Sequence, residues 1–313
     1  MALTVTRGNL KTFLRANYYD KLDTVAQARV ERCIEDGLRM VGRAREWAHQ
    51  ISDTPVNALA PYSTGTVSVS NGGTSVTGSG TVFPSNVVTA NAFIEFNGEQ
   101  HWYPITVRTS DTALTIQNAY SNRSGTSLTD VTYTIVYPLY ELPANFRRHL
   151  SLLDVAANQC LAWADIPALW EAHSAHAGTA QPHAYGITTK RHDPNIKGLL
   201  LYPAPSQIEK YQLVYMRHSG WYDTAVPATS TFTMKAASDA VYVDWPDEKM
   251  DILYAAIMVK LYEEVAPERI SQAFGHYYQL LAEAQMDDAE NAQIRTLGSG
   301  KNMPRGHRYE IEA

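Results

Sequence analysis

The sequence predicts an α+β protein in which a helical-bundle core carries an inserted all-β module and a second, short β-hairpin. Residues 61–140 alternate β-branched or aromatic residues with small polar ones, a period of two that indicates strands. The flanking segments are rich in Asp, Glu and Arg and repeat apolar residues at helical spacing. We therefore expect a discontinuous helical core at 1–60 and 141–294, a β module at 61–140, and a flexible C-terminal tail at 295–313.

The composition of the chain argues against several classes of function. The chain has 313 residues, 45% of them hydrophobic and 19% charged, and its apolar runs are shorter than a membrane span. The N-terminus has no apolar signal segment, so we expect a cytoplasmic protein with no membrane partner. The formal net charge of −6 argues against a nucleic-acid binder, because such proteins cluster Lys and Arg. Cys33 and Cys160 lie among apolar neighbours and are interpreted as core residues; the sequence leaves a disulfide open, but a cytoplasm disfavours one.

Two helices are predicted before the β module. Leu10, Phe13 and Leu14 share one face of a short helix, and Asp23 can cap a longer one that runs from Thr24 to about Ile51. This second helix carries two adjacent apolar stripes, a band wider than a monomeric surface helix needs. It should therefore pack on two sides. We expect one of them to be a subunit interface, formed by Cys33, Gly37, Met40, Ala44, Trp47 and Ile51.

The β module is predicted to be a small sandwich or barrel. Asn71-Gly72-Gly73 and Asn97-Gly98 fall between alternating runs and predict hairpin turns, where glycine tolerates positive φ.

Five further elements are predicted after the module. Helical spacing from Asn145 to Leu161 predicts a helix, and a second should start at Asp165-Ile166-Pro167. Period-two residues from about 198 to 216 predict a hairpin around a Pro-rich turn. A helix from Trp245 to Pro267 and a last antiparallel helix complete the chain, whereas residues 218–243 show no organisation.

The sequence contains little that indicates catalysis. It has no P-loop, no HExxH and no Cys-x-x-Cys. The cluster formed by His173, His176, His183, His192 and Asp193 offers metal ligands, but no Glu stands in place as a general base, so solvated imidazoles are favoured and the odds of a metal site are roughly one in ten. We expect neither an enzyme nor a cofactor.

The order of elements resembles one family. A long helix ending in Arg45-Glu46-Trp47 is followed by GTVSVSNGGTSVTGSGT and WYPITVRTSDTALTIQNAY, then by Leu142-Pro143 with Phe146, LLLYPAP and a terminal helix pair. From about Leu3 to Ile294 this is similar to the head-to-tail adaptor proteins of tailed bacteriophages. The resemblance implies a helical-bundle virion protein at the neck, in a ring that is commonly twelvefold and is assembled in the host cytoplasm.

The resemblance also implies partners. These are the portal, tail nozzle or tail tube proteins and, through the β module, tail fibres or spikes, while DNA passes through the lumen without specific binding. Smaller adaptors lack so large an insertion, which leaves its role open. Adaptors use terminal segments to hold the portal, and the tail of this chain is basic. We therefore expect portal-binding residues at Arg295, Lys301, Met303, Arg305, Arg308 and Tyr309, against the alternative of a solvated end.

Two other function classes stay open. A minor tail or receptor-binding virion protein would use the β module for recognition, in which case Trp102, Tyr103 and Tyr120 should form an exposed patch; burial would favour a structural role. A metal hydrolase would require bound metal at the histidine cluster.

Overall fold

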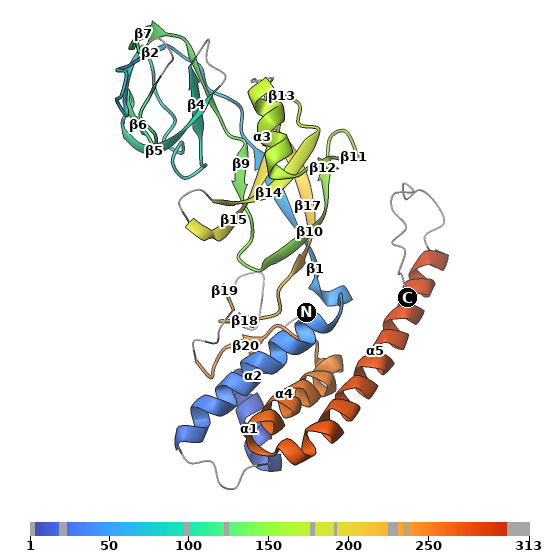
Figure 1. Cartoon of the computed structure of the whole chain (residues 1–313). Coiled ribbons are helices and arrows are strands. Elements are labelled where there is room, and N and C mark those ends of the chain that lie inside the picture. Colours follow the sequence, from blue (N-terminus) through green and yellow to red (C-terminus); the bar gives the residue numbers. More distant parts are fainter. Residues whose placement is uncertain are drawn as a thin grey trace. The chain divides into compact units, whose positions relative to one another are not determined.

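The computed structural model of the protein describes residues 4–18, 24–96, 101–121, 125–175, 179–190, 193–224, 231–234, 236 and 238–298. The chain forms two compact units, coloured by sequence in Figure 1. Met1–Gln50 and Ser219–Ala313 make the first, here called the helical unit, and Ile51–His218 make the second, the β unit. Each unit has its own hydrophobic core.

The N-terminal and C-terminal parts of the chain together form the helical unit. Its helices are α1 (Arg7–Tyr18), α2 (Thr24–Ala44), η1 (Ala48–Gln50), η3 (Asp247–Lys249), α4 (Met250–Val265), η4 (Pro267–Arg269) and α5 (Ile270–Gly298). The helices predicted at both ends are confirmed, and Figure 1 shows α5 returning along α4 after the break at Pro267. Every helix among the described residues is too short or too polar to span a bilayer.

A small antiparallel sheet closes the helical unit. It consists of β19 (Phe232–Thr233), β18 (Trp221–Tyr222) and β20 (Tyr242–Val243). Thr6 bridges to Tyr242, which ties the N-terminus to this sheet. The stretch 218–243, for which the sequence predicts no organisation, thus connects the first helix to the last helix pair.

The seven-stranded sheet of the β unit lies within the predicted module. Its order is β7 (Leu128–Val131), β2 (Thr66–Val69), β3 (Ser75–Ser79), β6 (Ala113–Ile116), β5 (Trp102–Ser110), β4 (Phe93–Phe96) and β8 (Tyr133–Val136). The predicted hairpin turn at Asn71–Gly73 is confirmed, with φ of +78° at Gly72, whereas Asn97-Gly98 lies outside the described residues.

The rest of the β unit is also mainly β. One sheet has the order β1 (Ile51–Ala58), β17 (Glu209–Arg217), β10 (Phe146–Asp154), β11 (Gln159–Cys160). A second has the order β12 (Ala162–Trp163), β14 (Ala184–Lys190), β15 (Asp193–Tyr202), β9 (Leu139–Glu141). Strands β13 (Thr179–Ala180) and β16 (Ala204–Pro205) form a pair, and α3 (Ile166–Ala175) packs on β14. Leu161 N donates to Leu152 O and Ala162 N to His183 O, so the short β11–β12 segment joins the two sheets.

The predicted fold class is wrong, because strands rather than helices build the chain between Ile51 and His218. The segment from Asn145 to Leu161, predicted as a helix, contains β10 and β11 instead. Register shifts at Phe146/Arg148 and His149/Ser151 interrupt the alternation of β10. These bulges give its apolar residues a spacing that imitates a helix, because each extra residue breaks the period of two.

Two other boundaries differ from the prediction. Helix α2 ends at Ala44, and Ile51 already begins strand β1, so the helix does not run to Ile51. The strands predicted near 198–216 exist, but they do not form a hairpin: β15 pairs with β14 and β9, whereas β17 pairs with β1 and β10. Period alone identifies a strand but not its partner.

Candidate functional site

Helix α2 has α4 as its close partner. A Cβ built on Gly37 would lie 2.7 Å from Cγ1 and 2.8 Å from Cα of Ile257. Only glycine allows this approach without a shift of α4. Both helices contribute to one core, in which Ile34, Ile257 and Leu253 are fully buried.

Helix α1 is held against the other side of α2 by an ion cluster. Lys11 Nζ lies 2.5 Å from Glu31 and 2.7 Å from Asp239, and Arg7 lies 3.0 and 2.9 Å from the same two carboxylates. Both cations are only 8% exposed, so they depend on these partners to offset desolvation. The hydrogen bond from Lys11 is the main cause that holds the pKa of Asp239 below its ordinary value.

Trp47 anchors the segment after α2. Its ring is fully buried, meets Trp245 edge-on at 5.1 Å, and carries the Arg45 guanidinium 4.6 Å from its centroid. Its Nε1 donates to the carbonyl of Val41 at 2.8 Å. The indole N–H and the ring of Trp47 therefore find their partners within the same helical unit.

The wide apolar band of α2 is thus filled mostly from inside the protomer. Of the six predicted interface residues, Cys33, Gly37 and Trp47 are buried in the helical unit and are not available to a neighbour. Met40 is partly buried against the same core, whereas Ala44 and Ile51 are exposed. An interface through those three stays a prediction. Much of the second stripe is therefore covered by other elements of the same helical unit.

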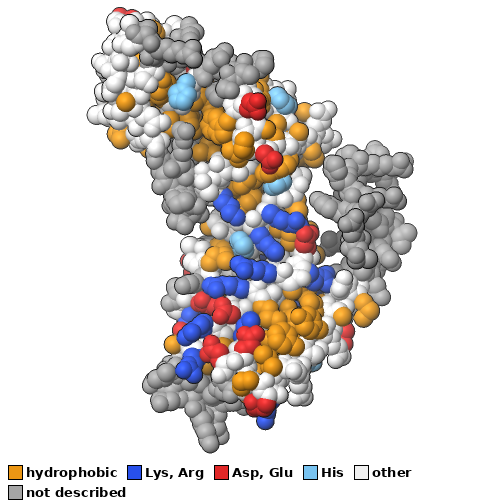
Figure 2. Space-filling view, viewed as in Figure 1, with side chains coloured by type: hydrophobic (Ala, Val, Ile, Leu, Met, Phe, Trp, Pro, Cys, Tyr) orange, Lys and Arg blue, Asp and Glu red, His pale blue; other side chains and the backbone are white. Residues whose placement is uncertain are grey.

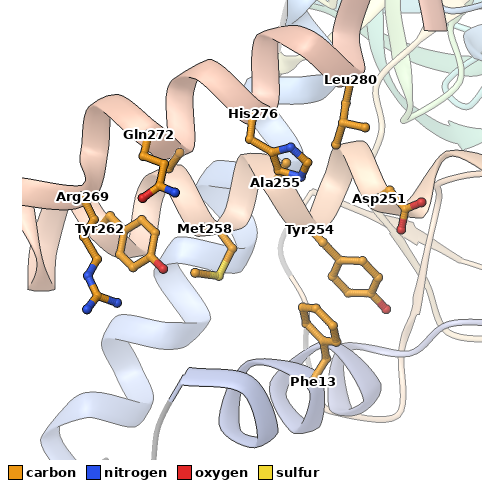
Figure 3. A pocket seen from close by; sticks show the side chains of 11 residues that line it. Phe13, Asp251, Tyr254, Ala255, Met258, Tyr262, Arg269, Gln272, His276 and Leu280 are labelled. Atoms are coloured by element: carbon orange, nitrogen blue, oxygen red, sulfur yellow. The ribbon is translucent and has the colours of Figure 1, made fainter. Parts of the chain in front are cut away.

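One groove of the helical unit lies between α4 and α5, closed at one side by α1, with a volume of about 610 Å³. Its lining combines apolar and polar side chains in equal measure; it consists of Phe13, Asp251, Tyr254, Ala255, Met258, Tyr262, Arg269, Gln272, Ala273, His276 and Leu280. Figure 3 shows Arg269 and Tyr262 at one end and Asp251 at the other.

Aromatic contacts fix the wall of this groove. The Phe13 and Tyr254 rings stack 4.0 Å apart, which joins α1 to α4. Burial, followed by the charges of Asp251 and Asp247, raises the pKa of Tyr254 above its ordinary value, so its hydroxyl stays neutral. Within the described part of the chain, the Arg269 side chain has no ion-pair partner, although it is exposed at the groove's end. The groove therefore combines aromatic and aliphatic side chains with an exposed cation at one end.

The sequence carries a signal for this groove that the prediction did not use. Helix α4 reads MDILYAAIMVKLYEEV, apolar around most of its circumference, which is typical of a helix with partners on more than one side. Its core stripe runs through Leu253, Ile257 and Leu261. The groove residues Tyr254, Met258 and Tyr262 follow the same four-residue spacing, displaced by one position.

The aromatic residues of the β module are interior. Trp102, Tyr103 and Tyr120 are 4, 5 and 0% exposed. Tyr103 and Tyr120 contact Phe96 in the module's core, and Trp102 Nε1 donates to Glu95 at 3.0 Å. Burial is the main cause of a raised pKa at Glu95. Tyr103 and Tyr120 therefore belong to the module's core, whereas Trp102 also packs against Ala204 outside the module. The three rings leave no aromatic platform of the kind that recognition by these residues would need.

Of the predicted metal ligands, only His183 has a described side chain, so the cluster is not tested. His183 meets the Tyr202 ring edge-on at 5.7 Å, and no group of three His, Cys, Asp or Glu side chains that the structure describes could hold a metal ion. The side chains of His173, His176, His192 and Asp193 lie outside the described residues. Cys33 is buried and Cys160 is exposed, each as a free thiol, so only the first is the predicted core residue.

The predicted portal-binding residues fall on the last part of the chain. Helix α5 continues to Gly298, so Arg295 belongs to the helix and not to a tail, although its side chain is outside the described part. Lys301, Met303, Arg305, Arg308 and Tyr309 also lie outside the described residues. Their role stays a prediction.

No protein-family model matches the sequence, and a search of curated proteins finds no match.

Proposed function

We propose that this chain is a structural virion protein, a head-to-tail adaptor that forms a ring beneath the portal of a tailed bacteriophage. The observation that carries the proposal is the open groove on the helical unit. Figure 2 shows hydrophobic side chains gathered on the surface of this unit, over α4 and α5. A concave surface that combines apolar and polar side chains has the composition of a protein–protein contact. The resemblance in element order supplies the identity of the partners.

Two further features support an assembly role. The buried Trp102, Tyr103 and Tyr120 favour a structural β module over a receptor-binding one. The net charge of −6 suits a lumen through which DNA passes without being held, since phosphates are bound by clustered cations. In this role the chain contacts the portal on one side and tail nozzle or tail tube proteins on the other, at the neck of the virion.

The test is to locate the chain in assembled particles. A small tag fused after Ala313 would be labelled in purified virions and imaged. Label at the junction of capsid and tail is expected, and label at the tail tip or on fibres would favour the recognition alternative. Purified portal rings mixed with the chain should form a complex of fixed stoichiometry, and failure to bind them would contradict the proposal.

A further inference from the structure

The α4 side of the groove has the same order of side chains in both directions. Tyr254 and Tyr262 each lie four residues from Met258, so their rings stand about one turn to either side of it. Figure 3 shows all three side chains along the groove, with Met258 between the two tyrosines. When the helix is reversed about Met258, each tyrosine takes the place of the other.

The α5 side of the groove carries opposite charges at equal distances from its centre. Arg269, at the end of η4, and Glu283 each lie seven residues from His276, about two turns or 10 Å along the helix. At 3.6 residues per turn, these three positions lie within about 20° of one line. His276 and Leu280 line the groove, and Glu283 continues the same side of α5 beyond them. Reversal about His276 therefore exchanges a positive charge for a negative one.

Both of these charges are available to a partner. Arg269 and Glu283 are exposed and have no ion-pair partner among the described residues, although Glu283 accepts a hydrogen bond from Gln279 at 3.0 Å. Fourteen residues, about 21 Å of helix, separate them, so they cannot pair within one copy. Asp251 adds an exposed carboxylate at the end of the groove opposite Arg269. The groove thus has a basic end and an acidic end.

A two-fold axis through the middle of the groove brings opposite ends together. Figure 3 shows Met258 and His276 near the middle, between Arg269 at one end and Asp251 at the other. An axis that crosses α4 at Met258 and α5 at His276 lays a second copy face to face on the first, with each helix antiparallel to its own counterpart. Each basic end then faces an acidic one, and the two tyrosine positions exchange. The two α4–α5 pairs form a four-helix bundle, in which the groove lining becomes the core.

We infer that two copies of this chain pair groove to groove about this axis, with Arg269 of each copy against Glu283 of the other. Tyrosine, methionine and arginine line the groove and are residue types enriched in protein–protein interfaces. The same surface serves both copies, so the contact is isologous and ends at a dimer. The two ion pairs fix the antiparallel register, because a parallel alignment of the two α5 helices brings like charges together.

The dimer forms from the chain alone and does not require the proposed ring. It covers the groove that the proposed function assigns to contacts in the virion, so its consequence for assembly rests on that function. On that basis the dimer is a form of the free chain that must open before assembly. It keeps copies from assembling away from a portal.

The first test uses two charge reversals, made separately and then in one chain. Arg269→Glu and Glu283→Arg each place like charges at both ends of the dimer, so each should raise the dissociation constant roughly tenfold or more in sedimentation equilibrium. The chain that carries both substitutions should recover most of the wild-type affinity, because the reversed charges face each other again. This rescue reports on a contact between copies, since the two positions are too far apart to meet within one.

A second test locates the axis. His276→Cys, in a chain whose exposed Cys160 is replaced by Ser, places the same thiol from both copies at the axis, so oxidation should give a disulfide-linked dimer. Cys33 is buried and does not compete. Tyr278→Cys is the matched control: its position is exposed but lies about 160° around α5 from His276, so it should not cross-link. The oxidised His276→Cys dimer should bind portal rings at least roughly tenfold more weakly than the same variant after reduction.

Controls separate folding from pairing. Gln285→Arg adds a charge at an exposed position on the side of α5 away from the groove, and it should dimerise as the wild type does. Thermal melts of the charge variants, recorded at dilutions where the wild type is monomeric, should coincide with its melt because the replaced residues are exposed. A wild-type chain that sediments as a monomer at every concentration, a double variant as weak as the single ones, or a failure of His276→Cys to cross-link would overturn the dimer, even if the chain binds portal rings. A dimer that passes these tests in a chain that does not bind portal would contradict the proposed function instead.

Discussion

Gly37 of α2 lies directly against the backbone of Ile257 in α4. A Cβ on Gly37 would fall 2.8 Å from the Cα of Ile257, a distance that requires one helix to move. The position of α4, and with it one wall of the groove, therefore depends on the absence of a single methyl group.

Gly37→Ala should destabilise the helical unit although alanine is the better helix former. We expect a loss of about 1–3 kcal/mol from overpacking. Gly275→Ala is the matched control, since its Cβ meets nothing within 4 Å and it should stabilise by up to about 1 kcal/mol. Denaturant unfolding of both variants measures the difference, and a stabilised Gly37→Ala protein would contradict the packing described.

Asp239→Asn should weaken the hold of α1 on α2. The variant leaves the buried Lys11 with one carboxylate partner fewer, which should lower the free energy of unfolding by about 1–2 kcal/mol. This loss is limited because Asp239 is half-exposed, so that water screens its charge. Because the folded pKa is depressed, this contribution is present above the unfolded pKa and is lost as pH falls through the folded pKa. The difference in unfolding free energy between the wild type and Asp239→Asn should therefore shrink below about pH 4.

The control for this cluster is Glu263→Gln. Glu263 pairs with Lys260 on the surface at 2.9 Å, and the same carboxylate-to-amide change there should cost less than about 0.5 kcal/mol. Denaturant titrations at pH 7 measure the loss of stability in each variant. Equal losses would show that the ion cluster around Arg7 and Lys11 stabilises the fold no more than a surface ion pair does.

The two thiols should differ sharply in reactivity. Burial, followed by the charge of Glu264, raises the pKa of Cys33 to about 12, whereas Cys160 is exposed on β11. Since the thiolate is the nucleophile, a thiol reagent at pH 8 should modify one cysteine per native chain and two in denaturant. Cys160→Ser should abolish the native reaction, and a native reaction that survives it would mean that Cys33 is accessible.

Excision of the β module should leave the helical unit folded. Replacing residues 61–137 with a short Gly-Ser linker keeps β9, which pairs with β15, and removes all seven strands of the module. The helical circular dichroism signal should still melt cooperatively. Removal also takes away Trp102, which meets Trp170 edge-on at 5.9 Å, so the remaining β unit should lose stability. Loss of the helical transition would show that the module is needed by the whole chain.

Truncation after Gly298 should weaken portal binding and leave the melting temperature unchanged. The removed segment carries Lys301, Arg305 and Arg308, whose contacts with portal carboxylates would be multiplied by ring closure. Binding of the intact chain should also be more sensitive to salt. A pull-down in which both forms bind portal equally would assign no portal contact to this segment.

The sequence predicts correctly those parts of the fold in which apolar residues keep one spacing over a long stretch. Helices α1, α4 and α5 and the turn at Asn71–Gly73 follow from it. It fails at β10, where two bulges interrupt the alternation, and at β15 and β17, where partners are set by long-range packing. It also cannot tell whether the second stripe of α2 faces another subunit or α1 and α4, because both demand the same apolar residues.

The groove could be predicted only in part for a related reason. The apolar residues Tyr254, Met258 and Tyr262 are visible as a second stripe on α4, but the stacking of Phe13 on Tyr254 depends on the ion cluster that places α1. Burial of Trp102, Tyr103 and Tyr120 likewise depends on a seven-stranded sheet whose order, β7-β2-β3-β6-β5-β4-β8, no local pattern specifies.

The chain leaves the helical unit after Gln50 and returns to it at Ser219. Gln50 Nε2 donates to Ser219 Oγ at 2.9 Å, while Ile51 opposite Met216 begins an eight-pair ladder between β1 and β17. The first and last strands of the β unit are therefore neighbours in one sheet, so the unit has the closely spaced ends of a domain inserted into another.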